Sequence, residues 1–227
     1  MNYFAHALCH LDRPWFMVGA AVPDLLSVVD RAVRVRPKGV DAFLTDAEGV
    51  QREVALGIRQ HFFDDDWFHR TRGFAEVTAL MTVQFRELLA GGDGFRCGFL
   101  GHITTEMLLD AVLIRQFPAE FEAYYRQLAT IQPETVQATV NQMARGQTLQ
   151  LAAVIHYFAK EQFLRDYQTD QGLLWRLNHV QARVKLAKLP VEAVAVLAYG
   201  RDLIANRVRD LLPQETYPNL PVSTCPG

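Results

Sequence analysis

Apolar residues recur every three or four positions along most of this chain, as they do through Val54, Ile58 and Phe62. This period places them on one face of an α-helix. Strict alternation bounded by Asn-Gly or Asp-Gly turns, the pattern of a β-hairpin, is absent. The sequence therefore predicts an all-α fold, a single compact bundle of about eight helices.

Proline and glycine divide the pattern into segments. The GGDG run at 91–94 is suited to end a long helix. The charged stretch 30–43, interrupted by Pro37 and Gly39, is interpreted as a surface crossing. Helical segments are expected in a short opening stretch and near 15–30, 48–63, 66–90, 96–115, 118–130, from 133, 147–168, 171–187 and 190–211.

No repeat or low-complexity segment suggests more than one domain. We expect a single helical domain over 1–212, with a motif-bearing part at 1–115 and a helical C-terminal part at 116–212. The last residues, 213–227, include the run PNLPVSTCPG, which contains three prolines. They are expected to form an extended tail.

Charge and cysteine content exclude several classes of protein. The net charge is −2 and the charged residues, 21% of the 227, are interspersed with apolar ones, so nucleic acid is not an expected partner. Cys9, Cys97 and Cys225 form no CxxC pair, which favours a reducing compartment over a disulfide framework. Neither a signal peptide nor an apolar run of ~18 residues is present. The expected location is cytoplasmic, with no membrane span.

Histidine and carboxylate residues recur at four-residue spacing in GIRQHFFDDDWFH. His61 and Asp65 are separated by one helical turn, and His69 follows a further turn along. On a continuous helix the three side chains project in one direction. The segment GFLGHITTEMLLD repeats the spacing with His102, Glu106 and Asp110.

Two helices that each present a histidine and a carboxylate are a common way to build a metal site inside a bundle. Imidazole and carboxylate suit divalent transition ions, and His6 adds a further imidazole. The sequence predicts one or two ions of manganese, zinc or iron. Arg70 is a candidate phosphate clamp. Asp110 is a candidate to orient a ligand or accept a proton from water.

Each of these features also has a plain structural interpretation. A single histidine–carboxylate pair on a helix is more often a surface ion pair or a satisfied core histidine, and Arg70 is more often solvated. Asp66 is interpreted as an N-cap of the helix expected from residue 66. His10, His156 and His179 lack a matched carboxylate and are expected to be structural or surface residues.

The segments MNYFAH, VGAAVPD and GIRQHFFDD together resemble the acyl carrier protein phosphodiesterase family, which is similar to HD-type metal phosphohydrolases. The resemblance covers roughly residues 1–115. It implies metal-dependent hydrolysis of a phosphodiester, with manganese as the usual ion and the phosphopantetheine arm of acyl carrier protein as the substrate. The matching positions are Met1, Asn2, Ala5, His6, Gly19, Asp24, Gly57, Ile58, His61 and Asp65.

The segments VGAAVPDLL and FLGHITTE also resemble zinc-dependent phospholipase C-like proteins. That resemblance implies zinc ligands at His61, Asp65, His69, His102 and Glu106. Both resemblances imply a helical metal phosphoesterase.

Two functional hypotheses follow from the sequence. The first is a metal-dependent phosphodiester hydrolase. Its partner is a phosphodiester substrate, for which the phosphopantetheine arm of acyl carrier protein is one candidate. Its metal ligands are His6, Asp24, His61, Asp65, His102 and Glu106, with His69 as a further ligand. The second is a non-catalytic helical scaffold with a structural or degraded metal site, because His102, Glu106 and Met107 stand where the first family has an Asp-x-x-x-Asp-His run.

Overall fold

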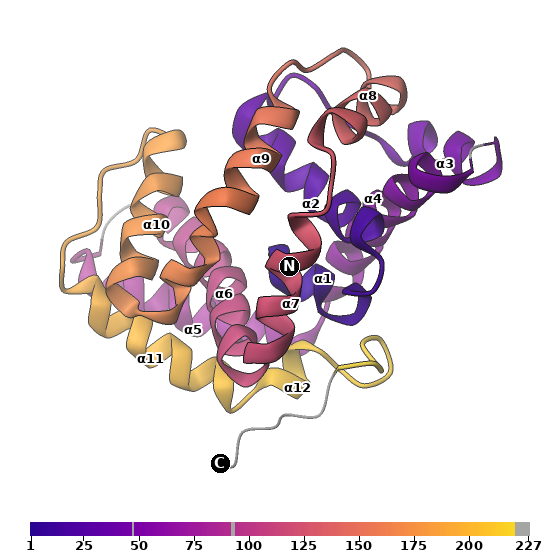
Figure 1. The fold of residues 1–227 in the computed structure, drawn as a ribbon. Helices are drawn as coiled ribbons and strands as arrows, with labels where there is room; N and C mark the ends of the chain where they lie inside the picture. Colours follow the sequence, from indigo (N-terminus) through magenta and orange to yellow (C-terminus); the bar gives the residue numbers. More distant parts are fainter. Residues whose placement is uncertain (47, 92–93, 221–227) are drawn as a thin grey trace. The chain divides into compact units, whose positions relative to one another are not determined.

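The computed structural model describes residues 1–46, 48–91 and 94–220, and all of the regular elements within them are helices (Figure 1). The all-α prediction is confirmed. The predicted number of helices, about eight, is wrong, because the described residues form twelve α-helices and two short 3-10 helices. These are α1 Tyr3–Ala7, η1 Leu8–His10, α2 Pro14–Val29, α3 Pro37–Asp46, α4 Gly49–Phe68, α5 Arg72–Leu88, α6 Gly94–Gln116, α7 Pro118–Leu128, α8 Pro133–Met143, α9 Leu151–Glu161, η2 Phe163–Gln168, α10 Asp170–Arg183, α11 Ala193–Ala205 and α12 Val208–Leu211.

Two differences from the predicted boundaries matter for the site. The predicted surface crossing contains α3, because Pro37 occupies the first turn of a helix, where a missing N–H costs nothing. The predicted break before Asp66 does not exist, since α4 continues to Phe68. The next helix is capped by Thr71, whose hydroxyl accepts a hydrogen bond from the Phe74 N–H at 3.1 Å.

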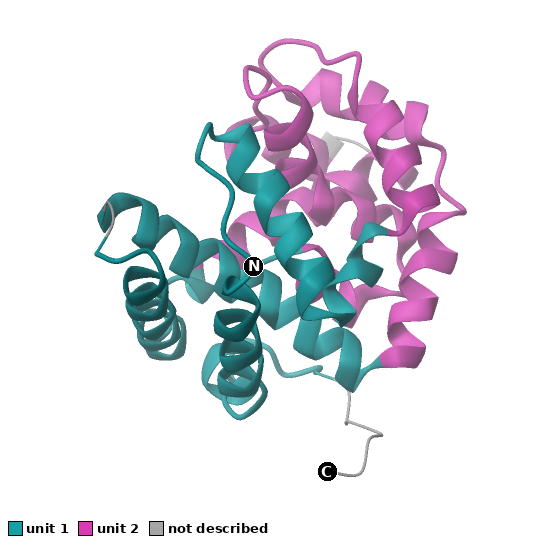
Figure 2. Ribbon diagram, turned by 90° about the vertical axis from the view of Figure 1, so that its left-hand side faces the viewer, with its two compact units in different colours: residues 1–2, 67–117, 163–227 teal, residues 3–66, 118–162 magenta. Residues whose placement is uncertain are grey.

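The chain groups into two compact units (Figure 2). Unit 1 comprises residues 1–2, 67–117 and 163–227, and unit 2 comprises 3–66 and 118–162. Each unit draws on both halves of the chain, so neither coincides with the predicted division at residue 115. The single domain over 1–212 stays a prediction.

In unit 2, glycine lets α2 and α4 pack backbone against backbone. A Cβ atom on Gly57 would lie 2.0 Å from the Phe16 carbonyl oxygen, and one on Gly19 would lie 2.4 Å from the Val54 carbonyl oxygen. Only glycine fits at such a distance. The close approach brings the middle of α4, which contains His61, against the backbone of α2.

Aromatic packing fixes the short helix α1 in the same unit. Phe4 is fully buried, and its ring meets the edges of Phe121 and Tyr124 on α7 at centroid distances of 5.5 and 5.8 Å. Edge-to-face pairs of this kind add to the stabilisation from buried area. A five-residue helix would not be stable alone, so this packing holds His6 in place.

In unit 1, α6 is the central helix and packs against α5 and α11. A Cβ atom on Gly101 would lie 2.8 Å from the Thr78 carbonyl oxygen, so glycine is required for α5 and α6 to approach. Among the described helices, α6 is long and apolar enough to cross a membrane. However, 72% of the most apolar 18-residue stretch of this helix is buried, and buried core helices of soluble proteins can be equally long and apolar.

The predicted extended tail differs from the structure over residues 213–220. The Tyr217 N–H donates to the Pro213 carbonyl at 2.7 Å, and the Tyr217 side chain is buried with its ring 6.4 Å from that of Trp67. Turns replace an extended chain because burying tyrosine offsets the ordering cost. Residues 221–227 lie outside the described part.

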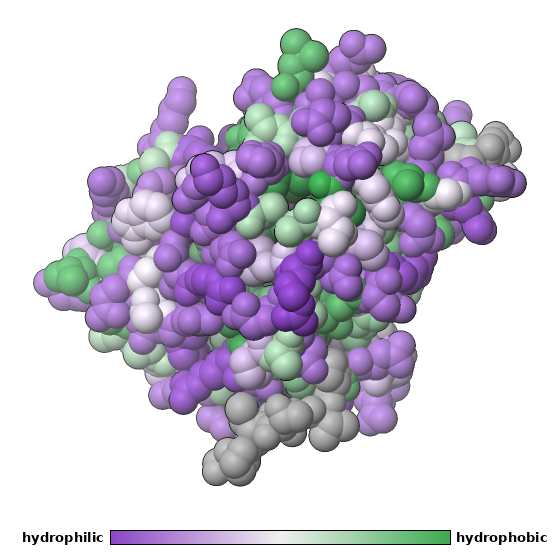
Figure 3. Space-filling model, viewed as in Figure 1, coloured by the Kyte–Doolittle hydropathy of each residue, from purple (hydrophilic) through white to green (hydrophobic). Residues whose placement is uncertain are grey.

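Hydrophilic residues predominate on the face shown in Figure 3, with apolar ones in small groups.

Candidate metal centres

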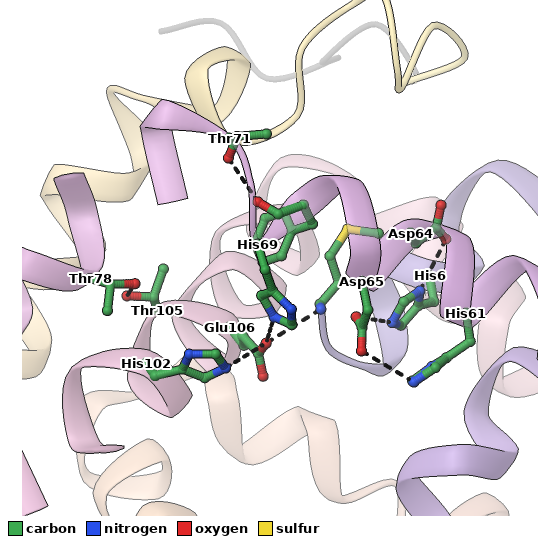
Figure 4. A network of polar contacts seen from close by, with 12 residues as sticks. His6, His61, Asp64, Asp65, His69, Thr71, Thr78, His102, Thr105 and Glu106 are labelled. Carbon is green, nitrogen blue, oxygen red and sulfur yellow. Dashed lines mark hydrogen bonds and ion pairs between the residues drawn. The ribbon is translucent and has the colours of Figure 1, made fainter. Parts of the chain in front are cut away.

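Unit 2 contains a group of two histidines and one aspartate, which we name the buried triad: His6, His61 and Asp65. Helix α1 supplies His6, and α4 supplies the other two from consecutive turns (Figure 4). His6 is 2% exposed and His61 is 4% exposed, whereas the Asp65 side chain is 31% exposed. The triad is therefore closed around its imidazoles and open to solvent at its carboxylate.

Outer partners orient both imidazoles of the buried triad. His6 Nδ1 lies 3.1 Å from Oδ2 of Asp64, and Oδ1 of the same carboxylate accepts a hydrogen bond from Gln60 at 2.8 Å. His61 Nδ1 donates to the Ala20 carbonyl oxygen at 2.9 Å. In each ring the Nδ1 atom is thus engaged, and Nε2 is directed at the triad. Metal-binding histidines are held in the same way.

The two imidazoles differ in charge when no metal is bound. Burial alone lowers the pKa of His6, but its bonds to Asp64 and Asp65 outweigh burial and raise the pKa to about 9. Burial and the neighbouring charge of His6 lower the pKa of His61 to about 3. His61 is consequently neutral at pH 7, with its Nε2 lone pair available, whereas a metal on His6 must displace a proton.

The carboxylate of the buried triad is ionised. Burial alone raises the pKa of Asp65, but the hydrogen bond from the charged His6 imidazole holds that pKa well below its usual range. Asp65 therefore provides the negative charge that a divalent ion requires.

The spacing of the donor atoms fits one bound ion. Both His6 Nε2 and His61 Nε2 lie 3.4 Å from oxygens of Asp65. Ligands about 2.0–2.1 Å from a tetrahedral ion are separated by about 3.3 Å, so little movement is needed. His6 Nε2 is also buried, and its contact with Asp65 at 3.4 Å is long for a hydrogen bond, an arrangement that costs free energy unless a closer partner binds. The residues of the buried triad fit a divalent transition ion.

Unit 1 contains a second group with the same kinds of donor, which we name the open triad: His69, His102 and Glu106. His69 lies in the turn after α4, and α6 supplies the other two one turn apart (Figure 4). The His102 side chain is 45% exposed and that of Glu106 is 12% exposed. Phe74 packs against both imidazoles, with ring centroids 4.9 and 5.1 Å away.

One carboxylate oxygen of the open triad is surrounded by nitrogen atoms. Glu106 Oε1 lies 2.7 Å from His69 Nε2, 3.4 Å from His102 Nε2 and 3.4 Å from the Met1 amino nitrogen. Burial alone raises the pKa of Glu106, but the Met1 charge and the bonds from His102 and His69 hold it well below its usual range. The 2.7 Å contact is a direct hydrogen bond, so the pair must separate before both atoms bind one ion.

The structure corrects the prediction that His69 extends the face formed by His61 and Asp65. Helix α4 ends at Phe68, so His69 leaves the helical register and joins the open triad instead. A chain of three ligands on one helix is therefore wrong, whereas the pairs at four-residue spacing are confirmed as close neighbours.

Three further predicted site residues lie in neither triad. Asp24 is a half-buried residue of α2 whose backbone carbonyl accepts from Ser27. Asp110 is fully buried on α6. Burial raises the pKa of Tyr167, and the nearby charge of Asp110 raises it further. Arg70 is exposed in the turn beside His69. Their proposed roles stay predictions.

Sequence reasoning did not find the outer partners. Asp64 belonged to an acidic run that we interpreted as a possible helix start, yet it fixes His6. The sequence feature that could have indicated this role is the four-residue spacing from Gln60 to Asp64. That spacing is informative only once α4 is known to continue past Asp64. The Ala20 carbonyl left no signal in the sequence. The remaining histidines, His10, His156 and His179, belong to neither triad.

Comparison with known proteins gives no family assignment: no protein-family model, curated protein or solved structure matches this chain. The resemblances to metal phosphoesterases therefore remain predictions from the sequence.

Proposed function

We propose that this protein is a metal-dependent phosphodiester hydrolase. The observation on which the proposal rests is the buried triad, in which His6 and His61 are held at Nδ1 and face the Asp65 carboxylate with Nε2. Manganese, zinc and iron all accept this donor set. The two sequence resemblances, to acyl carrier protein phosphodiesterases and to phospholipase C-like proteins, favour phosphodiesters as the substrate class.

The chain's own residues then have distinct tasks. When bound, a divalent ion lowers the pKa of water and offsets negative charge on phosphoryl oxygens. Asp64 and the Ala20 carbonyl keep the imidazoles oriented. The Asp65 side chain is partly exposed, so water and substrate enter the site from its side. The open triad binds a second ion more weakly, with Arg70 as the phosphate clamp and Asp110 as a positioning residue.

A non-catalytic scaffold is the second candidate. The observation that favours it is the near-complete burial of His6 and His61, since structural metal sites are closed whereas catalytic sites keep an open position. In this case the metal would stabilise the helical fold, which would act by binding a partner.

The test combines metal analysis with a hydrolysis assay. Purified protein is analysed by elemental mass spectrometry and assayed with bis(4-nitrophenyl) phosphate and with phosphopantetheinylated acyl carrier protein, each with manganese, zinc and iron. The hydrolase predicts that His61→Ala loses turnover and the ion of the buried triad, while the fold and the ion of the open triad are retained. The exposed His156→Ala is the matched control.

Two outcomes separate the candidates. Metal without turnover, together with a lower melting temperature for His61→Ala, would favour the structural scaffold. Absence of metal after incubation with all three ions would contradict both.

A further inference from the structure

Unit 2 also contains a cavity of about 380 Å³ where α2 ends and the chain continues towards α3. Its volume is in the range of small-molecule sites, roughly 300–1,000 Å³. Most of its wall is apolar, formed by Pro23, Leu26, Val33, Val35 and Phe62. Such a wall favours the apolar part of a ligand.

The remainder of the wall is positively charged. Arg31 and Arg34 line the cavity, whereas no acidic side chain among the described residues does so. Arg31 Nε donates to the Ser27 carbonyl and Arg34 Nε to the Arg31 carbonyl. Among the described residues neither arginine has a carboxylate partner. Two guanidinium groups that backbone carbonyls hold, and that no carboxylate neutralises, favour an anionic ligand.

Backbone contacts hold this wall in place. The Val33 N–H donates to the Asp30 carbonyl at 3.1 Å, and the Arg145 N–H donates to the Arg34 carbonyl at 3.4 Å. Val33 and Val35 are buried. The segment that bears both arginines is therefore positioned before any ligand binds, which lowers the entropic cost of binding.

The cavity adjoins the buried triad through one side chain. Phe62 lines the cavity, and its ring meets that of His61 edge-to-face at a centroid distance of 5.8 Å. Helix α2 likewise contributes Leu26 to the cavity and the Ala20 carbonyl to His61. The ring of Phe62 thus stands between the cavity and His61, and no residue of the triad lines the cavity itself.

We infer that this cavity binds the non-reacting part of the substrate, an apolar group that bears an anion. The anion, a carboxylate or a second phosphate, lies against Arg31 and Arg34, and the apolar group lies against the hydrophobic wall. The inference rests on the proposed hydrolase, since it assigns that enzyme a class of phosphodiester with an acidic, apolar ester group.

The test uses phenylphosphonate, whose carbon–phosphorus bond resists hydrolysis, and measures binding by calorimetry to the full chain after chelator treatment. Without metal, the triads cannot attract the anion through an ion. We expect Arg31→Gln/Arg34→Gln to weaken binding by about tenfold or more, since each charged hydrogen bond is a strong one. Arg36→Gln, a neighbouring exposed arginine outside the cavity wall, is the control and should change binding less than about twofold.

Two comparison ligands test the combined recognition. Inorganic phosphate offers only the anion and benzyl alcohol only the ring, so both should bind more weakly than phenylphosphonate. Benzoate in place of phenylphosphonate distinguishes a carboxylate from a phosphate as the preferred anion. Equal binding of phenylphosphonate by the wild type and the double variant, with circular dichroism unchanged, would overturn the inference. So would inorganic phosphate that binds as tightly as phenylphosphonate.

Hydrolysis of bis(4-nitrophenyl) phosphate by the metal-loaded protein is measured in parallel. Turnover without arginine-dependent binding would overturn the cavity assignment and leave the hydrolase intact. Arginine-dependent binding without turnover would support the cavity as a ligand site and overturn its part in hydrolysis.

Discussion

The buried triad of unit 2 and the open triad of unit 1 contain the same donors, two imidazoles and one carboxylate. In the buried triad both imidazoles are fixed from behind, and their Nε2 atoms stand 3.4 Å from the carboxylate. In the open triad His69 is hydrogen-bonded directly to Glu106 at 2.7 Å. The same donor groups thus give one arrangement that is spaced for an ion and one that must open to admit it.

The difference teaches that outer contacts, rather than the ligands, decide how ready a site is. Asp64 and the Ala20 carbonyl occupy the Nδ1 atoms of His6 and His61. The open triad is held instead by the ring of Phe74, by the Met1 amino group beside Glu106 and by contacts among its own members. We therefore expect the buried triad to bind metal more tightly, and the following experiments can contradict that ranking.

The largest effect is expected for His61→Ala. Removing this ligand should weaken metal binding at the buried triad by more than the ~10–100-fold that loss of an outer partner typically costs. Metal bound per chain should fall while the ion of the open triad remains. Elemental mass spectrometry and competition with a chromophoric chelator measure this, with His156→Ala as the control. Unchanged metal content would exclude the buried triad as a site.

A smaller effect is expected for Asp64→Asn, which keeps the shape of the side chain and removes its charge. Because Asp64 orients His6 from outside the triad, the affinity should fall by about 10–100-fold. The same chelator competition applies, and Asp41→Asn, an exposed aspartate in unit 2, is the control. A loss as large as that of His61→Ala would mean that Asp64 is itself a ligand.

In the metal-free chain, the free energy of unfolding should change with pH by up to about 1.4 kcal/mol per pH unit. The pKa of His6 is raised from 6.5 to about 9, so its contribution to stability is complete below pH 6.5 and lost as pH rises through 9. The pKa of His61 is lowered to about 3, so its contribution is complete above pH 6.5 and lost as pH falls towards 3.

Urea unfolding between pH 5 and 9 with chelator present measures this dependence. His6→Gln should flatten the alkaline side and His61→Gln the acidic side. An alkaline side that is equally steep in His6→Gln and in the wild type would show that His6 is not charged in the folded chain.

The smallest effect is expected for Glu106→Gln in the open triad. Water reaches the open triad at the side chain of His102, which is 45% exposed, and screening in a medium of high dielectric weakens each contact, so we expect metal binding there to fall by only about tenfold. Stepwise chelator addition should also remove the wild-type ion of the open triad first. If the ion of the buried triad left first, the ranking of the two triads would be reversed.

Much of the fold and part of the site were predictable from local pattern. The 3.6-residue apolar period required helices, and the pairs His61–Asp65 and His102–Glu106 follow from helical geometry alone. His69 was misplaced because the end of α4 depends on the Thr71 cap, which competes with continuation of the helix.

The sequence by itself determined that the chain is helical and that histidine and carboxylate pairs share helix faces, because both depend on residues less than two turns apart. Only the tertiary structure decided that His6 joins His61 and Asp65, and that the Ala20 carbonyl holds His61. Those contacts join residues more than forty positions apart. The contact of His61 with Ala20 depends on the glycine-mediated approach of α2 and α4, and the place of His6 depends on the packing of α1 on α7. Periodicity along a chain contains no information about which distant helices meet, since packing selects the partner.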